Sequence, residues 1–218
     1  MSDFINRIAT VKDIPFLANT IIEAEKSGTD KLSYSTIFGL SEDESRKYII
    51  DMLSEEVDGC ELSVSSFFVA ESAGQVVAAV SVWIEGVDGI PSSVLKGNLL
   101  SYTLPQHCIE RAVSIFPIIR DLQIEYEHDT IILGNGHVVK EFRGNNLLGI
   151  LMSERMKQLS LEKPGIKNAF AQVFECNTPS LRTCEKLGFH RSMVKTSTND
   201  EILQYLPYHS KVLLKKSI

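Results

Sequence analysis

Hydrophobic positions at the start of the chain follow first a strand-like and then a helix-like spacing. A short apolar run over 4–8 predicts a strand, and the apolar residues after Thr10 and Asp13 recur every three or four positions, as on one face of a helix. Ser41 and Glu44 have the spacing of a helix-capping pair and predict the start of a second helix. Two helices are therefore expected before the first hairpin.

The firmest evidence for a sheet comes next, where runs of β-branched and aromatic residues cover 67–71 and 75–84. Ser72, Ala73 and Gly74 separate the two runs, and the glycine can supply the positive φ that a tight turn needs. This pattern predicts an antiparallel hairpin.

The next segment, about 86–126, interrupts the alternation. Three glycines and a proline predict a loop over 86–103. A helix is expected over 106–126, and Pro117 must kink or divide it. We expect the whole segment to be a mainly helical insertion that walls a substrate pocket.

The rest of the chain alternates strands with helices. A strand is expected over 130–139, where Gly134 and Gly136 indicate a bulge or the close approach of another backbone or a ligand. The other expected elements are a helix over 146–161, a strand over 169–175, a helix over 179–187 ended by Gly188, and strands near 190–197 and 210–216. No linker or internal repeat divides the 218 residues, so we expect one α/β domain over 1–218.

Charge and composition exclude several classes of protein. The net charge of −6 and the pI near 5.4 argue against nucleic acid as a partner. No segment approaches the roughly 18 consecutive apolar residues of a membrane helix, and the charged segment 1–13 does not resemble a signal peptide. The four cysteines form no CxxC pair, which argues against a metal site and a disulfide framework. We expect a cytoplasmic protein that binds no membrane, and a homodimer is the commonest assembly for such a chain.

The segment Val138–Leu148 carries the most informative chemistry, because it joins an expected strand to an expected helix through a polar turn. At a helix N-terminus several main-chain N–H groups lack partners within the helix, and the helix dipole adds partial positive charge. Such a turn can hold a pyrophosphate. Taken alone, the same pattern also fits the ordinary strand-to-helix connection of any α/β protein.

A second segment, about thirty residues later, favours the first of these interpretations. Asn177, Ser180 and the run Glu185-Lys186-Leu187-Gly188-Phe189 resemble the asparagine-to-YEKLGF stretch of the GNAT superfamily of acyl-CoA-dependent N-acetyltransferases. Three further segments resemble motifs of that superfamily in the same order: 7–13 its first strand and helix, 68–77 its central hairpin, and 138–148 its pyrophosphate-binding motif. These four motifs cover most of the chain outside the insertion.

The resemblance implies a GNAT-like α/β fold with a mixed, mostly antiparallel sheet, whose two splayed central strands take acetyl-CoA as co-substrate without a metal. Val138 and Val139 would pair with the pantetheine arm, and an amide at that level would stabilise the oxyanion formed when the acceptor amine attacks directly in a ternary complex. Asn177 is expected to cap the next helix and to hydrogen-bond the pantetheine. The residues implied to bind the pyrophosphate through their amides are Arg143, Gly144, Asn145, Asn146, Leu147 and Leu148.

The chain departs from the family's pattern at three positions. Asn146 replaces the usual second glycine of the phosphate loop, and Leu148 replaces the glycine or alanine that follows it. Asparagine tolerates left-handed φ, whereas leucine needs more room, so we expect CoA binding to persist in weakened form. Cys184 stands where many members have a tyrosine that protonates the departing thiolate. A thiol with a pKa of about 8.5 can transfer that proton, although a buried structural cysteine is the commoner role.

The general base has two sets of candidates. His137 ends the expected strand and titrates near neutral pH, but a histidine in that position is more often a core or edge residue. Glu125, Glu127 and His128 come just before the same strand, and the alternative for them is a solvated helix end.

These residues predict an N-acetyltransferase that transfers an acetyl group from acetyl-CoA to a primary amine, most readily that of a small molecule. The alternative is a non-catalytic acyl-CoA-binding or sensor module, which the altered loop and the missing tyrosine favour. An ATP-binding α/β domain is disfavoured because the chain contains no GxxxxGK[ST] motif. The acceptor itself cannot be identified from the sequence.

Overall fold

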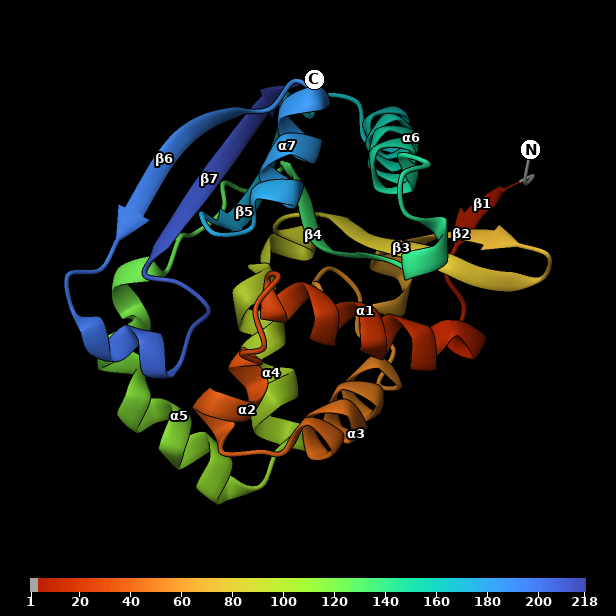
Figure 1. The fold of residues 1–218 in the computed structure, drawn as a ribbon. Coiled ribbons are helices and arrows are strands. Elements are labelled where there is room, and N and C mark those ends of the chain that lie inside the picture. Colours follow the sequence, from red (N-terminus) through yellow and green to blue (C-terminus); the bar gives the residue numbers. More distant parts are fainter. Residues whose placement is uncertain (1–3) are drawn as a thin grey trace.

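A seven-stranded sheet with helices on both faces forms the body of the molecule (Figure 1). The computed structural model describes residues 4–218, except the side chain of Val87, so the part of the N-terminal expectation that concerns 1–3 lies outside the described residues. In spatial order the strands are β1 (Ile5–Ile8), β2 (Phe67–Ser72), β3 (Gln75–Ile84), β4 (Ile131–Val138), β5 (Asn168–Phe174), β7 (Ser210–Ser217) and β6 (His190–Thr196).

Every neighbouring pair of strands is antiparallel except β4 and β5, which run parallel. This confirms the expected mixed, mostly antiparallel sheet. The helices are α1 (Ile14–Lys26), α2 (Ser33–Phe38), α3 (Glu42–Leu53), α4 (Ser92–Thr103), α5 (Gln106–Ile119), α6 (Leu147–Glu162) and α7 (Thr178–Lys186). Figure 1 shows α6 and α7 on one side of the sheet and α1 to α5 on the other.

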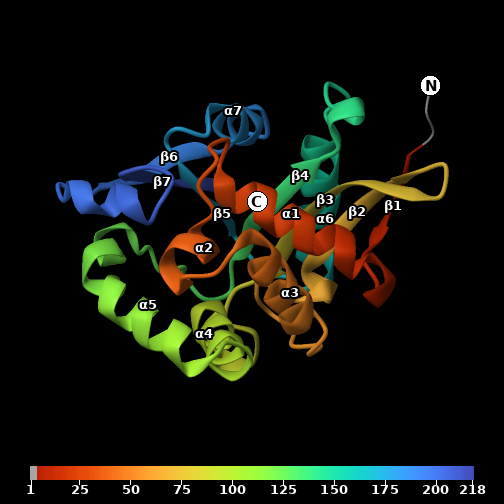
Figure 2. The same ribbon diagram turned by 60° about the horizontal axis from the view of Figure 1, so that its bottom comes forward.

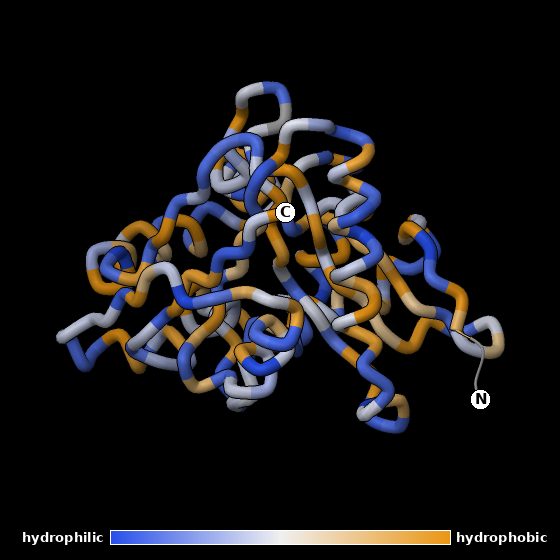
Figure 3. The backbone as a smooth tube through the Cα atoms, turned by 90° about the horizontal axis from the view of Figure 1, so that it is seen from above, coloured by the Kyte–Doolittle hydropathy of each residue, from blue (hydrophilic) through white to orange (hydrophobic). Residues whose placement is uncertain are grey.

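The hydrophobic core is divided between the two faces of the sheet. Alternate residues of β2, β3, β4, β5 and β7 pack against the apolar side chains of α6 and α7. On the opposite face, α1 and α3 bury their apolar stripes against the other residues of β2 and β3. In Figure 3 the hydrophobic stretches run through the middle of the molecule, while its outermost loops are largely hydrophilic.

Local sequence signals account for the elements that were predicted correctly. The Glu44 N–H donates to Ser41 Oγ (3.2 Å) and the Ser41 N–H donates to the Glu44 carboxylate (2.8 Å), so the expected capping pair opens α3. The predicted hairpin is formed by β2 and β3, with Ser72 paired to Gln75 and with Gly74 at φ +78° in the turn. The predicted strands and helices after residue 130 are all present, with ends shifted by at most one residue.

The prediction of a loop over 86–103 is wrong, because most of this range forms α4. Pro91 lies immediately before the first turn of α4, where a missing N–H costs nothing, and Gly97 lies inside the helix with open space around it. The helix expected over 106–126 ends at Ile119, with Pro117 in its last turn. A third helix before the hairpin, α2, was not expected. None of the helices in the described range has the length and apolarity needed to cross a membrane.

Candidate active site

β4 and β5 separate along their length, and this separation locates the candidate site. Their parallel pairing comprises three residue pairs, Ile131 with Ala169, Ile132 with Phe170 and Leu133 with Ala171. Beyond these pairs β4 continues beside β3 to Val138, and β5 continues beside β7 to Phe174. The expected splaying of the two central strands is therefore confirmed. Figure 2 shows the group β1–β4 on the right and the group β5–β7 on the left.

A β-bulge marks the point where β4 leaves β5. Gly134 and Asn135 together lie opposite Ser81 of β3, and the Asn135 N–H donates to Ser81 Oγ (2.8 Å). A Cβ on Gly134 would lie 2.5 Å from Ser81 Oγ and 2.6 Å from the Trp83 ring, so only glycine fits there without displacing buried atoms. The predicted bulge is confirmed, and the close approach comes from side chains of the neighbouring strand.

The β4–α6 turn, residues 139–146, follows β4 at this parted end. Gly144 (φ +89°) and Asn146 (φ 55°) both adopt left-handed φ, which turns the chain sharply into the 16-residue helix α6. The main-chain N–H groups of residues 144–149 have no acceptor among the described residues, and residues 143–146 are exposed. The corner is therefore open, and it presents unpaired amides at the positive end of a long helix.

The two unusual side chains of this turn, those of Leu148 and Asn146, each lie against a glycine. Leu148 points away from the turn and toward β4, where a Cβ on Gly136 would lie 3.4 Å from its Cδ2. The side chain of Asn146 lies over Gly149, where a Cβ would come within 2.6 Å of Asn146 Oδ1. No pattern in the sequence indicates these contacts of Gly136 and Gly149, because the pairing of small and large residues here depends on tertiary structure.

At the end of β4, the main-chain groups of Val138 point toward the side from which β5 has separated. The Val139 N–H donates to the carbonyl of Val77 on β3 (2.9 Å), so this amide is already used within the sheet. Backbone groups alternate in direction along an antiparallel strand, which points those of Val138 away from β3. Arg143 Nε donates to the Val138 carbonyl (3.1 Å), and the Arg143 side chain is otherwise exposed.

Asn177 lies at the matching end of the other parted strand. It follows β5 directly and caps α7, since its Oδ1 accepts the Ser180 N–H at 3.3 Å. Parallel strands place their carboxyl ends at the same edge of a sheet, so Asn177 and the β4–α6 turn flank one opening. The structure thus brings these two predicted parts of the site together.

Cys184 is buried in the core. It lies seven positions after Asn177, about 10 Å along the helix, and packs in the core between α6, α7 and the sheet with 2% of its surface exposed. Burial raises the pKa of its thiol to about 11.

His137 lies on the opposite face of β4 from the core of α6 and α7. Its ring is half-buried below α1, with its centroid 6.3 Å from that of Phe16. Burial lowers the pKa of His137 below its usual value, although the charge of Glu23 opposes this shift. The imidazole is therefore neutral at pH 7 and able to accept a proton. Glu125, Glu127 and His128, in contrast, are exposed at the other end of the eight-residue strand, roughly 23 Å away.

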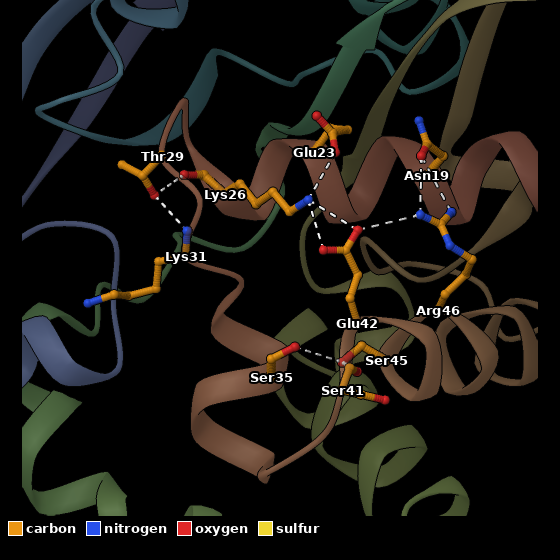
Figure 4. Close-up of polar contacts among 10 residues, drawn as sticks. All are labelled: Asn19, Glu23, Lys26, Thr29, Lys31, Ser35, Ser41, Glu42, Ser45 and Arg46. Carbon is orange, nitrogen blue, oxygen red and sulfur yellow. Dashed lines mark hydrogen bonds and ion pairs between the residues drawn. The ribbon is translucent and has the colours of Figure 1, made fainter.

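Polar contacts tie α1, the helix above His137, to α3 (Figure 4). Lys26 Nζ lies 3.3 Å from Glu23 Oε1 and 3.0 Å from Glu42 Oε2 on α3. Arg46 reaches back to Asn19 at 3.4 Å, which adds a second link between the two helices. The described residues contain no cluster of three or more side chains suited to bind a metal ion.

Comparison with known proteins was made by sequence and by structure. No protein-family model and no curated protein matches the sequence. Solved structures do match: an N-acetyltransferase from Staphylococcus aureus Mu50 has a TM-score of 0.66 at 13% identity, over 97% of this chain and 100% of that one. A Drosophila melanogaster polyamine N-acetyltransferase that forms N-acetylagmatine has a TM-score of 0.57 at 16% identity, over 99% and 100%.

A third match is an acetyltransferase of the GNAT family from Streptococcus pneumoniae, with a TM-score of 0.51 at 13% identity over 99% of both chains. Identities this low show a shared fold. The chain has the fold of the GNAT-family acetyltransferases.

Proposed function

We propose that the protein is an acyltransferase, an N-acetyltransferase that moves the acetyl group of acetyl-CoA to the primary amine of a small molecule. The observation that carries this proposal is the β4–α6 turn, where unpaired amides at the N-terminus of α6 face the opening between β4 and β5. An anionic pyrophosphate suits such a site. Structural neighbours that acetylate agmatine and polyamines support a small amine as acceptor.

Named groups of the chain would divide the work of holding the co-substrate. The amides of residues 144–148 would bind the pyrophosphate, and Arg143 would add positive charge beside it. The Val138 N–H would pair with the pantetheine arm, while Val139, which donates its N–H to Val77, would hold this part of the chain beside β3. The side-chain amide of Asn177 would reach the same arm from the other side of the opening.

The transfer is a direct displacement at the thioester. The amine nitrogen attacks the carbonyl carbon, the C–N bond forms, the C–S bond breaks, and CoA leaves as a thiolate. The attacking nitrogen loses one proton, which neutral His137 would accept directly or through water.

Cys184 is poorly suited to protonate the thiolate. Transfer from a thiol of pKa about 11 to a thiolate whose acid has a pKa of about 8.5 is uphill by about 3 kcal/mol. Its burial also keeps it away from the opening, so water would supply this proton.

Release of free CoA thiol in the presence of a panel of primary amines tests the proposal. We expect release that requires both acetyl-CoA and an amine, with the acetylated amine detected by mass spectrometry. The alternative, an acyl-CoA-binding or sensor module, predicts a rise in Tm with acetyl-CoA and no release with any amine. The cytoplasmic location, the homodimer and the single domain with its insertion stay predictions from the sequence.

A further inference from the structure

Charged and polar side chains gather on the α1–α5 face of the sheet, where an apolar core would be expected. Lys96 of α4 forms an ion pair with Glu61, and its Nζ lies 5.7 Å from the centre of the Tyr34 ring on α2. Lys211 of β7 holds its Nζ 4.9 Å from the centre of the Phe174 ring. Tyr126, Lys211 and Glu25 lie close enough to these groups for their charges to interact, and we call the full set the charged recess: Glu25, Tyr34, Glu61, Lys96, Tyr126 and Lys211.

The recess adjoins the parted strands. Lys211 pairs in register with Phe174, the last residue of β5, three positions beyond the final pair between β5 and β4. Ala171 and Val173 of β5 face the core of α6 and α7, so Phe174 and Lys211 face the other side, toward α1 to α5. Phe174 packs in one cluster with Ile37 of α2, and Cys176 Sγ lies 4.0 Å from the Ser27 carbonyl oxygen after α1, so the recess lies beside the parted end of β5 on the face of the sheet opposite to α6.

These groups are enclosed by the fold, yet solvent reaches them. The side chains of Lys96 and Glu61 keep 30% and 25% of their surface exposed, so they are not sealed in the core. Burial nevertheless lowers the pKa of Lys211 and raises the pKa of Tyr126, against their usual values. Because hydration of these charges is weakened, they would interact with the charges of a bound ligand more strongly than charges on the open surface do.

Three groups of the recess lack a partner of their own. The Glu25 carboxylate makes no hydrogen bond or ion pair with any described residue. The Lys211 ammonium lies over the Phe174 ring and forms no ion pair with a described carboxylate. Glu25 and Lys211 influence each other electrostatically but do not meet in an ion pair. The Tyr34 hydroxyl is buried without a hydrogen-bond partner in a residue that is 4% exposed.

We propose that the charged recess is the acceptor pocket, and that the acceptor is a primary amine that also carries an anionic group, either a carboxylate or a phosphate. Glu25 attracts the ammonium end, which gives one proton to water before the free amine attacks, Lys211 binds the anionic end, and the Tyr34 hydroxyl donates a hydrogen bond to the ligand. An acceptor with positive charge alone would leave Lys211 unpaired and repelled. This inference rests on the proposed acetyl transfer and adds the class of its acceptor.

Matched acceptors test this inference through kcat/KM for CoA release. We compare 4-aminobutyrate with butylamine, phosphoethanolamine with ethylamine, and include agmatine as a purely cationic amine. At least one acid-bearing amine should exceed its uncharged-tail match by about tenfold or more, as one charged hydrogen bond provides. The carboxylate and phosphate pairs then distinguish the two anions.

Lys211→Met should reduce that preference at least about fivefold, because the anion loses its partner. The matched control is Lys215→Met, since Lys215 lies on the same face of β7 with its Nζ 5.2 Å from the Phe170 ring and outside the recess. Lys215→Met should keep the preference. Where Lys211→Met fails to fold, Glu25→Gln carries the test and should raise KM for every amine.

Two kinds of failure are distinguishable. If butylamine or agmatine reacts as well as the acid-bearing amines, the inference is overturned while acetyl transfer stands. If no amine supports CoA release, the proposed function fails. Ligand binding, measured as a rise in Tm, then tests separately whether the charged recess holds an acid-bearing amine. A rise in Tm with 4-aminobutyrate or phosphoethanolamine that is lost in Lys211→Met and kept in Lys215→Met then supports it, and no rise in the wild-type protein overturns it.

Discussion

At the scale of single residues, Leu148 packs on the sheet against Gly136 of β4. A Cβ on position 136 would meet Leu148 Cδ2 at 3.4 Å, an ordinary contact distance, so the leucine side chain lies on the sheet and points away from the amides of the turn. A large residue in a phosphate loop is therefore compatible with an open corner when its side chain packs on the sheet. The Asn146 side chain does not pack on the sheet but lies over Gly149 in the first turn of α6.

Asn146→Gly should tighten the binding of acetyl-CoA. Position 146 has φ 55°, which glycine adopts without strain, and loss of the side chain uncovers the first turn of α6. We expect the Kd to fall about threefold or more by isothermal titration calorimetry. Asn145→Gly serves as the control, since it removes a hydrogen bond to the Phe142 carbonyl without uncovering the helix. Unchanged or weaker binding by Asn146→Gly would contradict this view of the turn.

His137→Gln should lower kcat/KM by about 10²–10⁴ if the imidazole accepts the proton of the amine. Because burial lowers the pKa of His137, the acid limb of the wild-type pH profile should lie below the ordinary histidine value of about 6.5. The variant should lose that limb. His128→Gln, at the far end of β4, is the control and should keep both the rate and the profile; a wild-type profile without an acid limb would remove His137 from this role.

At the scale of elements, the success of sequence interpretation depended on how local each signal was. The capping pair at Ser41 and Glu44 and the hairpin around Gly74 are set by residues close in sequence, and both were predicted correctly. The helix α4 was missed because Pro91 and Gly97 were counted as breakers. Their effect depends on position: a proline before the first turn starts a helix, and an exposed glycine only weakens one.

The bulge of β4 makes Gly134 a sensitive position. Gly134→Ala should destabilise the protein by about 1–3 kcal/mol, because the new methyl group meets the buried Ser81 and Trp83 side chains. Chemical denaturation measures the change. Gly97→Ala is the matched control: nothing lies within 4 Å of a Cβ there, and the helix should gain about 0.5–1 kcal/mol. Equal stability of Gly134→Ala and the wild-type protein would show that β4 is not held as tightly as described.

At the scale of the whole molecule, the parted strands followed from the family resemblance, whereas the charged recess could not be foreseen. Glu25, Lys96 and Lys211 come from the beginning, middle and end of the chain, and no pattern along the sequence joins them. Only the packing of α1 and α4 on the face of the sheet to which Lys211 of β7 points brings their charges together. Sites of this kind depend on long-range contacts, which periodicity and motif spacing do not contain.

Asp13 links the stability of the whole domain to pH. Its carboxylate, 7% exposed, accepts hydrogen bonds from Arg7 (2.7 Å) and from the Thr10 N–H (2.7 Å), and Arg7 also contacts Glu71 of β2. Burial acts to raise the pKa of Asp13, but these hydrogen bonds outweigh it and hold the pKa below its usual value. The stabilisation is therefore complete above the ordinary aspartate pKa of about 3.9 and is lost as the pH falls through the lower, folded-state value.

Asp13→Asn should cost about 1–3 kcal/mol at pH 7, and the gap to the wild-type protein should close as the pH falls below about 4. Urea denaturation at a series of pH values measures both quantities. Asp30→Asn, in an exposed turn, should change stability by less than about 0.5 kcal/mol. A gap that stays constant down to pH 2 would mean that the effect of Asp13 does not come from its charge.

Because β4 and β5 are joined by three residue pairs, the sheet consists of two halves with a short connection between them. Longer strand pairings hold each half together: one half is β1 to β4, and the other is β5, β7 and β6. Few main-chain hydrogen bonds connect the two halves. A narrow ligand bound between β4 and β5 would contact both halves of the sheet and restrict their relative motion. Amide hydrogen exchange would then slow in both at once, far beyond the few residues in contact with the ligand.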